Sequence, residues 1–279
     1  MRFSKMQALG NDFVVIDGVR QDVRLTSEQV RRICDRHLGA GCDQLLIVAP
    51  PEGPGYDFTY VIYNGDGSKA EQCGNGARCV AEFIAKKNLS GKKRIRLRTK
   101  AREIVTERHG GGIVSVDMGE PVFGAKASGF QERHPDLSQG APGVWRAKAL
   151  GGADIVPVSM GNPCAVLLMR EAPSQTEFER IGREISAGPY FTEGANAVFT
   201  RVLDRRNIAV RVFERGAGET LSCGTGSSAA AAAAIRLGLT ENKVTVHAAL
   251  GELAVAWRKG SGVVLTGPAA FVYDGMISI

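Results

Sequence analysis

The feature that most constrains this chain is a repeated Cys-Gly-x-Gly motif. The two copies begin at Cys73 and Cys223, which lie 150 positions apart. Each copy follows a polar, turn-rich loop and precedes a helix-like stretch. Two cysteines presented alike by two halves of a duplicated chain would supply two matched acid/base groups for one substrate.

Other landmarks recur at nearly the same spacing. They are Gly10-Asn11 with Gly161-Asn162, Tyr63-Asn64 with Phe213-Glu214, Leu89 with Leu239, and Gly119-Glu120-Pro121 with Gly267-Pro268. Internal repeats of this kind change the expected fold, because each half must then form a similar unit. The spacing predicts two homologous lobes of roughly 120 to 150 residues, an ordinary domain size.

The second half contains an unbroken run of alanine from Ala229 to Ala234 inside an expected helix, 225–237. Alanine is the strongest helix former, and a helix that is small and apolar on every side is buried. Residues 77–85 are the similar, more polar counterpart in the first half. We therefore predict an α+β fold of two pseudo-symmetric lobes, each a mixed β-sheet or barrel wrapped around a central helix.

Hydrophobic periodicity and turn residues predict the remaining elements. Thr26 is expected to cap a helix over 26–37, with Gln29 completing a capping box. Other helices are expected at 75–87 and 178–185, and strands at 13–16, 45–48, 58–63, 95–97, 103–107, 113–118, 166–169, 196–202, 208–213, 244–247, 253–257 and 262–265. Residues 64–72 and 214–222 are expected to be loops, and 119–153 a Gly-, Pro- and Ser-rich segment between the lobes.

Composition narrows the classes of protein. The apolar runs are short and no apolar segment follows the first residues, so we expect no membrane span and no secretory signal. Six cysteines without a dense framework indicate reduced thiols in a cytoplasm. The net charge of +6 comes largely from 92–98, where alternation suits a strand with a solvated basic face. That run lacks interleaved aromatic residues, so we expect no nucleic-acid partner, whereas acidic small molecules would be favoured.

The two cysteines precede expected helix starts, where the helix lowers a thiol pKa. The following glycines leave backbone N–H groups open, and such groups at a helix N-terminus bind anions. Each motif thus offers a thiol beside a carboxylate-sized site. Racemisation at an amino-acid α-carbon needs a base on one face, an acid on the other and stabilisation of the carboxylate, and no cofactor.

Other interpretations of these residues stay open. The cysteines can be buried and inert, as unpaired cysteine often is. Residues 224–229 fit the dinucleotide pattern GxGxxA, but that pattern directly follows a strand, and here the strand is expected to end near Phe213. A Cys73–Cys223 disulfide would indicate a redox protein. The chain has no Cys-x-x-Cys and no paired histidine spacing, so we expect no metal site.

Further polar residues stand at expected strand ends or in Gly-flanked loops of both halves. They are Asn11, Gln44, Asn64, Asn162, Asn196, Glu214 and Arg215. Singly, asparagine at such places is usually a turn former, and Glu214 and Arg215 can be a plain surface ion pair. Their recurrence in both halves favours a lining for a highly polar substrate, in which Arg215 can bind a carboxylate through two parallel hydrogen bonds.

The chain resembles the diaminopimelate epimerase family nearly from end to end. The matching strings are 6–13 (MQALGNDF), 43–46 (DQLL), 64–68 (NGDGS), 73–78 (CGNGAR), 160–163 (MGNP), 214–220 (ERGAGET), 223–226 (CGTG), 266–269 (TGPA) and 272–275 (VYDG). The resemblance implies two pseudo-symmetric lobes, with the active site in the cleft between them and the C-terminal tail returning to the first lobe. We expect residues 1–122 with 268–279 in the N-terminal lobe and 123–267 in the C-terminal lobe.

The resemblance also implies an isomerase that interconverts LL- and meso-diaminopimelate without pyridoxal phosphate, a step of lysine and peptidoglycan synthesis. Cys73 and Cys223 are implied as the two bases, and Glu214 as the residue that tunes them. The amides of Gly74, Asn75, Gly224 and Thr225 would hold the α-carboxylate. Asn11, Gln44, Asn64, Asn162, Asn196 and Arg215 would bind the rest of the substrate. A cytoplasmic homodimer with Tyr273 at its interface is implied as well.

Three positions depart from the family pattern. Cys164 stands where the family usually has a histidine that helps set the cysteine pKa values. Residues 192–194 read Thr-Glu-Gly instead of Pro-Glu-Arg, and Ser227-Ser228 replace Ala-Cys. The first departure supports an alternative, an epimerase or racemase that acts on a different amino acid by the same chemistry. A third hypothesis is a non-catalytic amino-acid-binding module.

Overall fold

The computed structural model describes residues 1–70, 73–100 and 102–278. The chain divides into two compact units, Met1–Asp117 with Thr266–Ile279, and Met118–Leu265. We call the first unit the N-terminal lobe and the second the C-terminal lobe. In the part of the chain that is described, no helix is both long and apolar enough to span a membrane.

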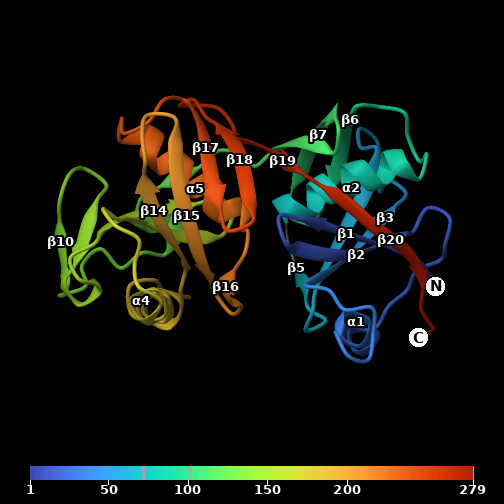
Figure 1. The fold of residues 1–279 in the computed structure, drawn as a ribbon, viewed down its shortest axis with the longest axis horizontal. Helices are drawn as coiled ribbons and strands as arrows, with labels where there is room; N and C mark the ends of the chain where they lie inside the picture. Colours follow the sequence, from blue (N-terminus) through green and yellow to red (C-terminus); the bar gives the residue numbers. More distant parts are fainter. Residues whose placement is uncertain (71–72, 101, 279) are drawn as a thin grey trace. The chain divides into compact units, whose positions relative to one another are not determined.

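The N-terminal lobe is a mixed sheet with one helix inside its curve (Figure 1). Its elements are β1 (Arg2–Ala8), β2 (Asn11–Asp17), α1 (Ser27–Cys34), β3 (Gln44–Ala49), β4 (Phe58–Asn64), β5 (Lys69–Ala70), α2 (Gly74–Lys86), β6 (Arg94–Arg98), β7 (Glu103–Gly110), β8 (Ile113–Asp117) and β20 (Ala270–Met276). The strands pair in the order β20-β1-β2-β3-β4-β6-β7-β8, and α2 packs against β1, β2, β3, β7, β8 and β20. Strand β20 thus returns the C-terminal segment to this lobe.

The C-terminal lobe repeats this plan. Its elements are β9 (Val122–Phe123), α3 (Ala125–Ser128), β10 (Leu137–Gln139), β11 (Trp145–Ala147), the 3-10 helix η1 (Lys148–Leu150), β12 (Asp154–Ser159), β13 (Pro163–Leu168), α4 (Gln175–Ala187), β14 (Asn196–Val202), β15 (Asn207–Glu214), β16 (Gly218–Thr220), α5 (Gly224–Arg236), β17 (Lys243–Ala248) and β18 (Gly251–Ala256). Strand β19 (Val264–Pro268) contains the boundary with the other unit. Helix α5 packs against β12, β13, β14, β15, β17 and β18.

Strand pairing shows the duplication directly. Antiparallel β1–β2, parallel β2–β3, antiparallel β3–β4 and parallel β4–β6 correspond to antiparallel β12–β13, parallel β13–β14, antiparallel β14–β15 and parallel β15–β17. Helices α2 and α5 follow equivalent strands and have 13 residues each. The predicted α+β fold, with a sheet wrapped around a central helix in each lobe, is confirmed.

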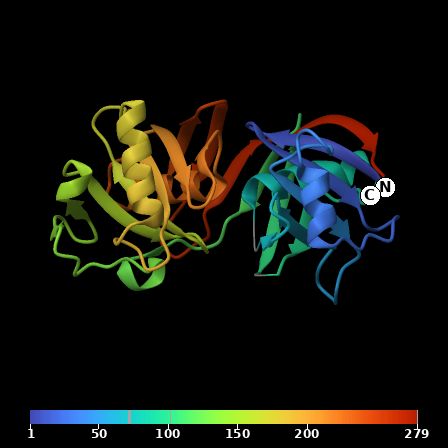
Figure 2. The same ribbon diagram turned by 90° about the horizontal axis from the view of Figure 1, so that it is seen from below.

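A second helix covers the other face of each sheet. Strand β14 is buried on both faces from Asn196 to Thr200, because α5 packs on one side and α4 on the other. Figure 2 shows α4, in yellow, lying along its sheet, and α1, in blue, in the same relation to the N-terminal lobe. Strands covered on both faces have continuous apolar sequences, which is why the sequence predicts strands at 45–48 and 166–169.

Helix α1 confirms the predicted cap and corrects the predicted end. Thr26 and Gln29 form the reciprocal capping box. The helix ends at Cys34, three residues before the predicted end at His37, because the Asp35 carboxylate accepts the backbone N–H groups of His37 and Leu38. An aspartate that bonds its own following backbone competes with helix continuation.

The expected loop segments contain short elements. Residues 119–153 include β9, α3, β10, β11 and η1, and the expected loops 64–72 and 214–222 include β5 and β16. Residues 71 and 72 of the first loop lie outside the described part. Strands β1, β12 and β20 were not predicted either. Strands of two or three residues, such as β5 and β9, are too short to show hydrophobic periodicity. Strand β12 contains Pro157, which argues against a strand in the sequence, so only its pairing with neighbouring strands defines it.

Candidate active site

Cys73 and Cys223 are the N-cap residues of α2 and α5. Both have extended backbone, with φ −150° and ψ 111° at Cys73 and φ −125° and ψ 113° at Cys223. Each sulfur accepts a backbone N–H three residues on, from Gly76 at 3.3 Å and from Gly226 at 3.4 Å. The helix N-terminus favours a thiolate in this position, and each lobe presents its cysteine at the same place on its helix.

The second glycine of each motif is needed for this close approach. A Cβ on Gly76 would lie 2.2 Å from Tyr60 Oη, and one on Gly226 would lie 3.0 Å from a methyl group of Val212. The helix start therefore packs directly on β4 in one lobe and on β15 in the other. That packing fixes where the sulfur stands relative to the sheet.

The surroundings of the two thiols differ. Cys223 is only 5% exposed, whereas Cys73 is partly exposed. Burial, the charge of Glu214 and the thiol of Cys164 raise the pKa of Cys223 well above its usual value, and hydrogen bonds from Thr225 and Gly226 oppose the increase. The neutral thiol is thus the favoured form of Cys223 in this structure.

In the N-terminal lobe, the predicted site residues form two hydrogen-bonded groups. Asn75 Nδ2 donates to Asn11 Oδ1 at 3.2 Å, which joins the first turn of α2 to the start of β2. Gln44 Nε2 donates to Asn64 Oδ1 at 2.9 Å, across the paired strands β3 and β4. Gly74 and Asn75 are buried in the first turn of α2.

In the C-terminal lobe, Asn162 Nδ2 donates to Thr225 Oγ1 at 3.3 Å, and Thr225 Oγ1 lies 3.4 Å from Cys223 Sγ. Asn196 Oδ1 accepts the backbone N–H of Arg215 at 2.9 Å. Among the described residues, Asn162 Oδ1 and Asn196 Nδ2 are buried without a hydrogen-bond partner. Buried polar atoms are normally satisfied, so these two amides indicate a polar ligand or water.

Glu214 is the last residue of β15 and Arg215 follows it, and the two side chains have different partners. Thr220 Oγ1 donates to Glu214 Oε1 at 2.6 Å, and the Glu214 charge reaches both Cys164 and Cys223. Arg215 Nη1 donates to the carbonyl of Glu193 at 2.9 Å and lies 3.7 Å from its carboxylate. The guanidinium is therefore held by the 192–194 segment, one of the three departures from the family pattern.

Cys164 lies on β13 and is fully buried. Its sulfur is 3.9 Å from the carbonyl oxygen of Asn162. Burial and the charge of Glu214 raise the pKa of the Cys164 thiol to about 12. The residue is therefore neutral near pH 7 and cannot supply the charge that a histidine at this position would carry when protonated.

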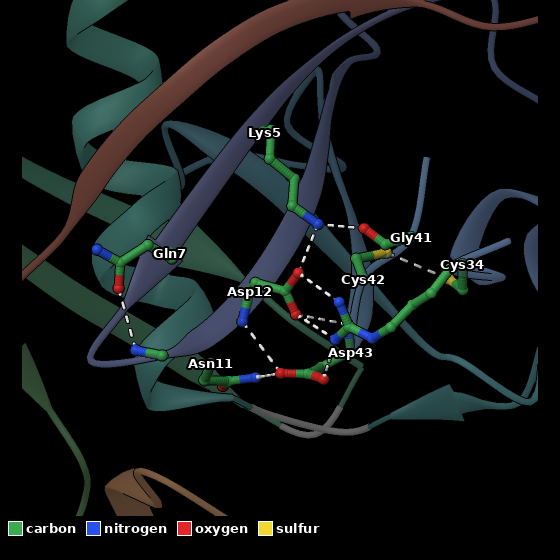
Figure 3. A network of polar contacts seen from close by, with 10 residues as sticks. Lys5, Gln7, Asn11, Asp12, Cys34, Gly41, Cys42 and Asp43 are labelled. Atoms are coloured by element: carbon green, nitrogen blue, oxygen red, sulfur yellow. Dashed lines mark hydrogen bonds and ion pairs between the residues drawn. The ribbon is translucent and has the colours of Figure 1, made fainter. Parts of the chain in front are cut away.

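The sequence did not reveal a network of charges at the start of β2 (Figure 3). Arg36 binds Asp12 at 2.7 Å and Asp43 at 2.8 Å, and Lys5 also binds Asp12. Asp43 Oδ2 in turn accepts Asn11 Nδ2 at 2.9 Å. Asp12 and Asp43 belong to two strings that carry the resemblance, 6–13 and 43–46, and those strings were the available signal.

The predicted interface residue, Tyr273, lies on β20, where it is paired with Lys5 of β1. Its ring is 45% exposed and contacts Phe3 edge-on, with ring centroids 6.1 Å apart. Across residues 1–70, 73–100 and 102–278, His, Cys, Asp and Glu side chains form no group of three that could hold a metal ion.

Comparison with known proteins supplies the family. The diaminopimelate epimerase family model matches residues 3–124 and 156–272. The chain is 45% identical to the diaminopimelate epimerase of Chromobacterium violaceum over 280 residues, covering 100% of this chain and 99% of that protein. It is 46% identical to the diaminopimelate epimerase of Azoarcus sp. over 281 residues, with the same coverage.

Solved structures with far lower identity share the fold. A phenazine biosynthesis protein of the PhzF family from Bacillus anthracis superposes with a TM-score of 0.69 at 16% identity, covering 100% of this chain and 99% of that one. A hydroxyproline epimerase from Agrobacterium vitis gives 0.68 at 14% identity, covering 99% and 91%. Because the family model matches most of the chain and full-length relatives are 45–46% identical to it, this chain belongs to the diaminopimelate epimerase family.

Proposed function

We propose that this protein is a diaminopimelate epimerase that interconverts the LL and meso isomers without pyridoxal phosphate. The observation that carries the proposal is the pair of N-cap cysteines, Cys73 and Cys223, on two duplicated helices. The relatives at 45–46% identity bear the name of this activity. A chain that supplies two thiols in equivalent settings has the acid and the base that inversion at carbon requires.

The proposed reaction removes the proton from one face of the α-carbon and adds a proton to the opposite face. The thiolate of one cysteine takes the α-proton, so the C–H electron pair passes into the carboxylate as an enediolate. The thiol of the other cysteine then gives its proton to the opposite face, and the second thiolate remains. Backbone N–H groups of Gly74, Asn75, Gly224 and Thr225 would hold the carboxylate while negative charge builds on it.

The rest of the substrate would be bound by the polar residues of both lobes. Diaminopimelate carries a second carboxylate and a second ammonium group. Arg215 suits the carboxylate, and the amides of Asn11, Gln44, Asn64, Asn162 and Asn196 suit both groups. The buried, unpartnered Asn162 Oδ1 and Asn196 Nδ2 support this assignment, because a bound ligand would satisfy them.

Glu214 has a separate proposed role. Its charge reaches Cys223 and favours the protonated thiol. We assign to Glu214 the task of keeping Cys223 as the acid in the resting enzyme. A cytoplasmic location remains part of the proposal. A homodimer with Tyr273 at its interface is also proposed, and the exposure of Tyr273 on β20 supports it.

The test is exchange of the α-proton in D2O, followed by NMR, on purified protein. LL-diaminopimelate should exchange and epimerise, and Cys73→Ser or Cys223→Ser should lower turnover at least about 1,000-fold, since each removes a required acid or base. Cys79→Ala is the matched control, because Cys79 is a buried cysteine on α2, the helix that Cys73 caps. Unexchanged substrate with folded wild-type protein would refute the proposal.

A second candidate is an epimerase of another amino acid, and Cys164 favours it because the family usually has a histidine there. The same assay on a panel of basic amino acids separates the two. Exchange of lysine, histidine or arginine without exchange of diaminopimelate would establish the second candidate. Ligand binding that survives both cysteine variants, with no exchange in the wild type, would indicate a binding module instead.

A further inference from the structure

Arg78 is a buried cation in the second turn of α2. Its side chain is 0% exposed. Nε donates to the carbonyl of Pro268 at 3.2 Å, and Nη2 donates to Asn75 Oδ1 at 2.9 Å. Within the described part of the chain, Nη1 has no hydrogen-bond partner and no carboxylate forms an ion pair with the guanidinium. Burying a charge without a counterion is costly, so this arrangement needs a compensating function.

The guanidinium begins a hydrogen-bond chain with a fixed direction. A guanidinium can only donate, so Asn75 must turn Oδ1 toward Arg78. Asn75 Nδ2 is then left to donate to Asn11 Oδ1, and Asn11 Nδ2 to donate to Asp43 Oδ2. Figure 3 shows the outer end of this chain, where Asn11 faces Asp43. Arg78 therefore sets the orientation of the Asn75 side-chain amide and, through it, of the Asn11 amide that the proposed function assigns to the substrate.

The charge of Arg78 also acts at the start of the helix. Burial lowers the pKa of Arg78 to about 10, and negative charge on the thiols of Cys79 and Cys73 opposes that decrease. Such interactions are mutual, so the protonated guanidinium favours a thiolate at Cys73. The N-terminal N–H groups of α2 act in the same direction.

The C-terminal lobe has no cation at the position equivalent to Arg78. The residue 150 positions after Arg78 is Ser228, which is neutral and fully buried on α5. There the side-chain bond runs the other way, because Asn162 Nδ2 donates to Thr225, the counterpart of Asn75. A buried cation, Arg78, thus acts on Cys73, whereas a carboxylate, that of Glu214, acts on Cys223.

We propose that Arg78 is a positioning residue for proton transfer: it holds the amides of Asn75 and Asn11 in one orientation and favours the thiolate of Cys73. This inference rests on the proposed function for the role of the Asn11 amide in substrate binding. The effect on the thiol does not depend on which amino acid is the substrate.

The first experiment measures iodoacetamide alkylation of each cysteine against pH, resolved by peptide mass spectrometry. In the wild type, the Cys73 midpoint should lie at least about one unit below the Cys223 midpoint. In Arg78→Gln, which keeps a donor for Asn75 but removes the charge, the Cys73 midpoint should rise by roughly one unit. Arg78→Lys keeps the positive charge, so its Cys73 midpoint should stay near the wild-type value. Arg108→Gln is the control, since Arg108 pairs with Glu82 on the same helix.

A wild-type Cys73 midpoint equal to or above that of Cys223 overturns the effect on the thiol, even if no variant folds. So does an unchanged Cys73 midpoint in folded Arg78→Gln. A purely structural role would lower the melting temperature of both Arg78 variants and leave their Cys73 midpoints equal to that of the wild type.

The second experiment measures steady-state epimerisation. Asn75→Ala, which leaves Arg78 in place, should reduce kcat/KM roughly 10- to 100-fold without moving the Cys73 midpoint. Full activity in Asn75→Ala overturns the positioning role. Wild-type protein that does not exchange diaminopimelate refutes the proposed function alone, because the alkylation profiles still decide the role of Arg78 at Cys73.

Discussion

Asn162 Nδ2 donates a hydrogen bond of 3.3 Å to Thr225 Oγ1, and this bond joins the turn before β13 to the first turn of α5. Because Oγ1 accepts from the amide, its own proton remains available for Cys223 Sγ, 3.4 Å away. The C-terminal lobe thus directs a hydroxyl donor at its thiol. This contact opposes the increase that burial and Glu214 impose on the pKa of Cys223.

Removal of this donor should make Cys223 harder to ionise. We expect Thr225→Val to raise the pKa of Cys223 further and to lower epimerase turnover about 5- to 10-fold, the usual effect of one lost hydrogen bond. Thr225→Ser keeps the hydroxyl and should behave like the wild type. Alkylation of the Cys223 peptide against pH is the measurement. Equal midpoints in the Val and Ser variants would contradict the role of Oγ1.

Glu214→Gln should have the opposite effect on the same thiol. The Glu214 charge raises the pKa of Cys223, so its removal should lower the alkylation midpoint of Cys223. Turnover should fall because the protonated form of Cys223, the proposed acid, is then less favoured. Glu219→Gln is the control, since Glu219 lies on β16 and pairs with Arg211. A Cys223 midpoint that rises in Glu214→Gln would contradict the claim that the Glu214 charge raises the pKa of Cys223.

Gly76→Ala should displace the start of α2. The added Cβ would lie 2.2 Å from Tyr60 Oη, so helix and strand must separate. We expect about 2 kcal/mol of lost stability and at least roughly tenfold lower activity, as for other overpacked cores. Tyr60→Phe removes the clashing hydroxyl and should restore part of both losses in the double variant. Gly91→Ala is the control, because a Cβ there meets nothing within 4 Å.

The charge network of Figure 3 should make folding sensitive to acid. Burial raises the pKa of Asp12, but hydrogen bonds from Arg36 and Lys5 outweigh burial and lower it to about 2. A folded-state pKa below the unfolded value of about 3.9 gives stability that is present above pH 4 and is lost as the pH falls toward 2.

Denaturant unfolding between pH 2 and pH 6 measures this contribution, which should not exceed about 2 kcal/mol after solvent screening. Asp12→Asn should remove that part of the pH dependence. Asp22→Asn should retain it, because the Asp22–Arg24 pair is exposed. Parallel pH profiles for the wild type and Asp12→Asn would exclude Asp12 as the source.

Cys164→Ala should leave turnover within about threefold of the wild type. The pKa of Cys164 is about 12, so the thiol is neutral at working pH and cannot act as a base. The D2O exchange assay checks this, with Cys223→Ala as the inactive comparison. Loss of exchange in Cys164→Ala would contradict this prediction and show that the reaction requires the Cys164 thiol.

Local pattern predicted the elements wherever one residue type dominates. The run Ala229–Ala234 predicted a buried helix, and all six residues are 0% exposed. Thr26 with Gln29 predicted a cap that is present. The pattern was wrong at the end of α1, where the Asp35 side chain accepts backbone N–H groups. It also missed β20, in which no residue is buried. Pairing with β1 defines β20, and that pairing joins residues about 270 positions apart.

The sequence by itself determined the duplication, the two cysteines at helix starts and the resemblance to a family, because repeats and caps are local or periodic signals. Only the tertiary structure decided that Arg78 is buried, that the amides of Asn75 and Asn162 donate in opposite senses, and that Cys223 is more buried than Cys73. These properties depend on contacts through space between residues 60 or more positions apart, such as Asn75 with Asn11 and Asn162 with Thr225. Burial and charge at those contacts set each thiol pKa, and no spacing in the chain encodes them.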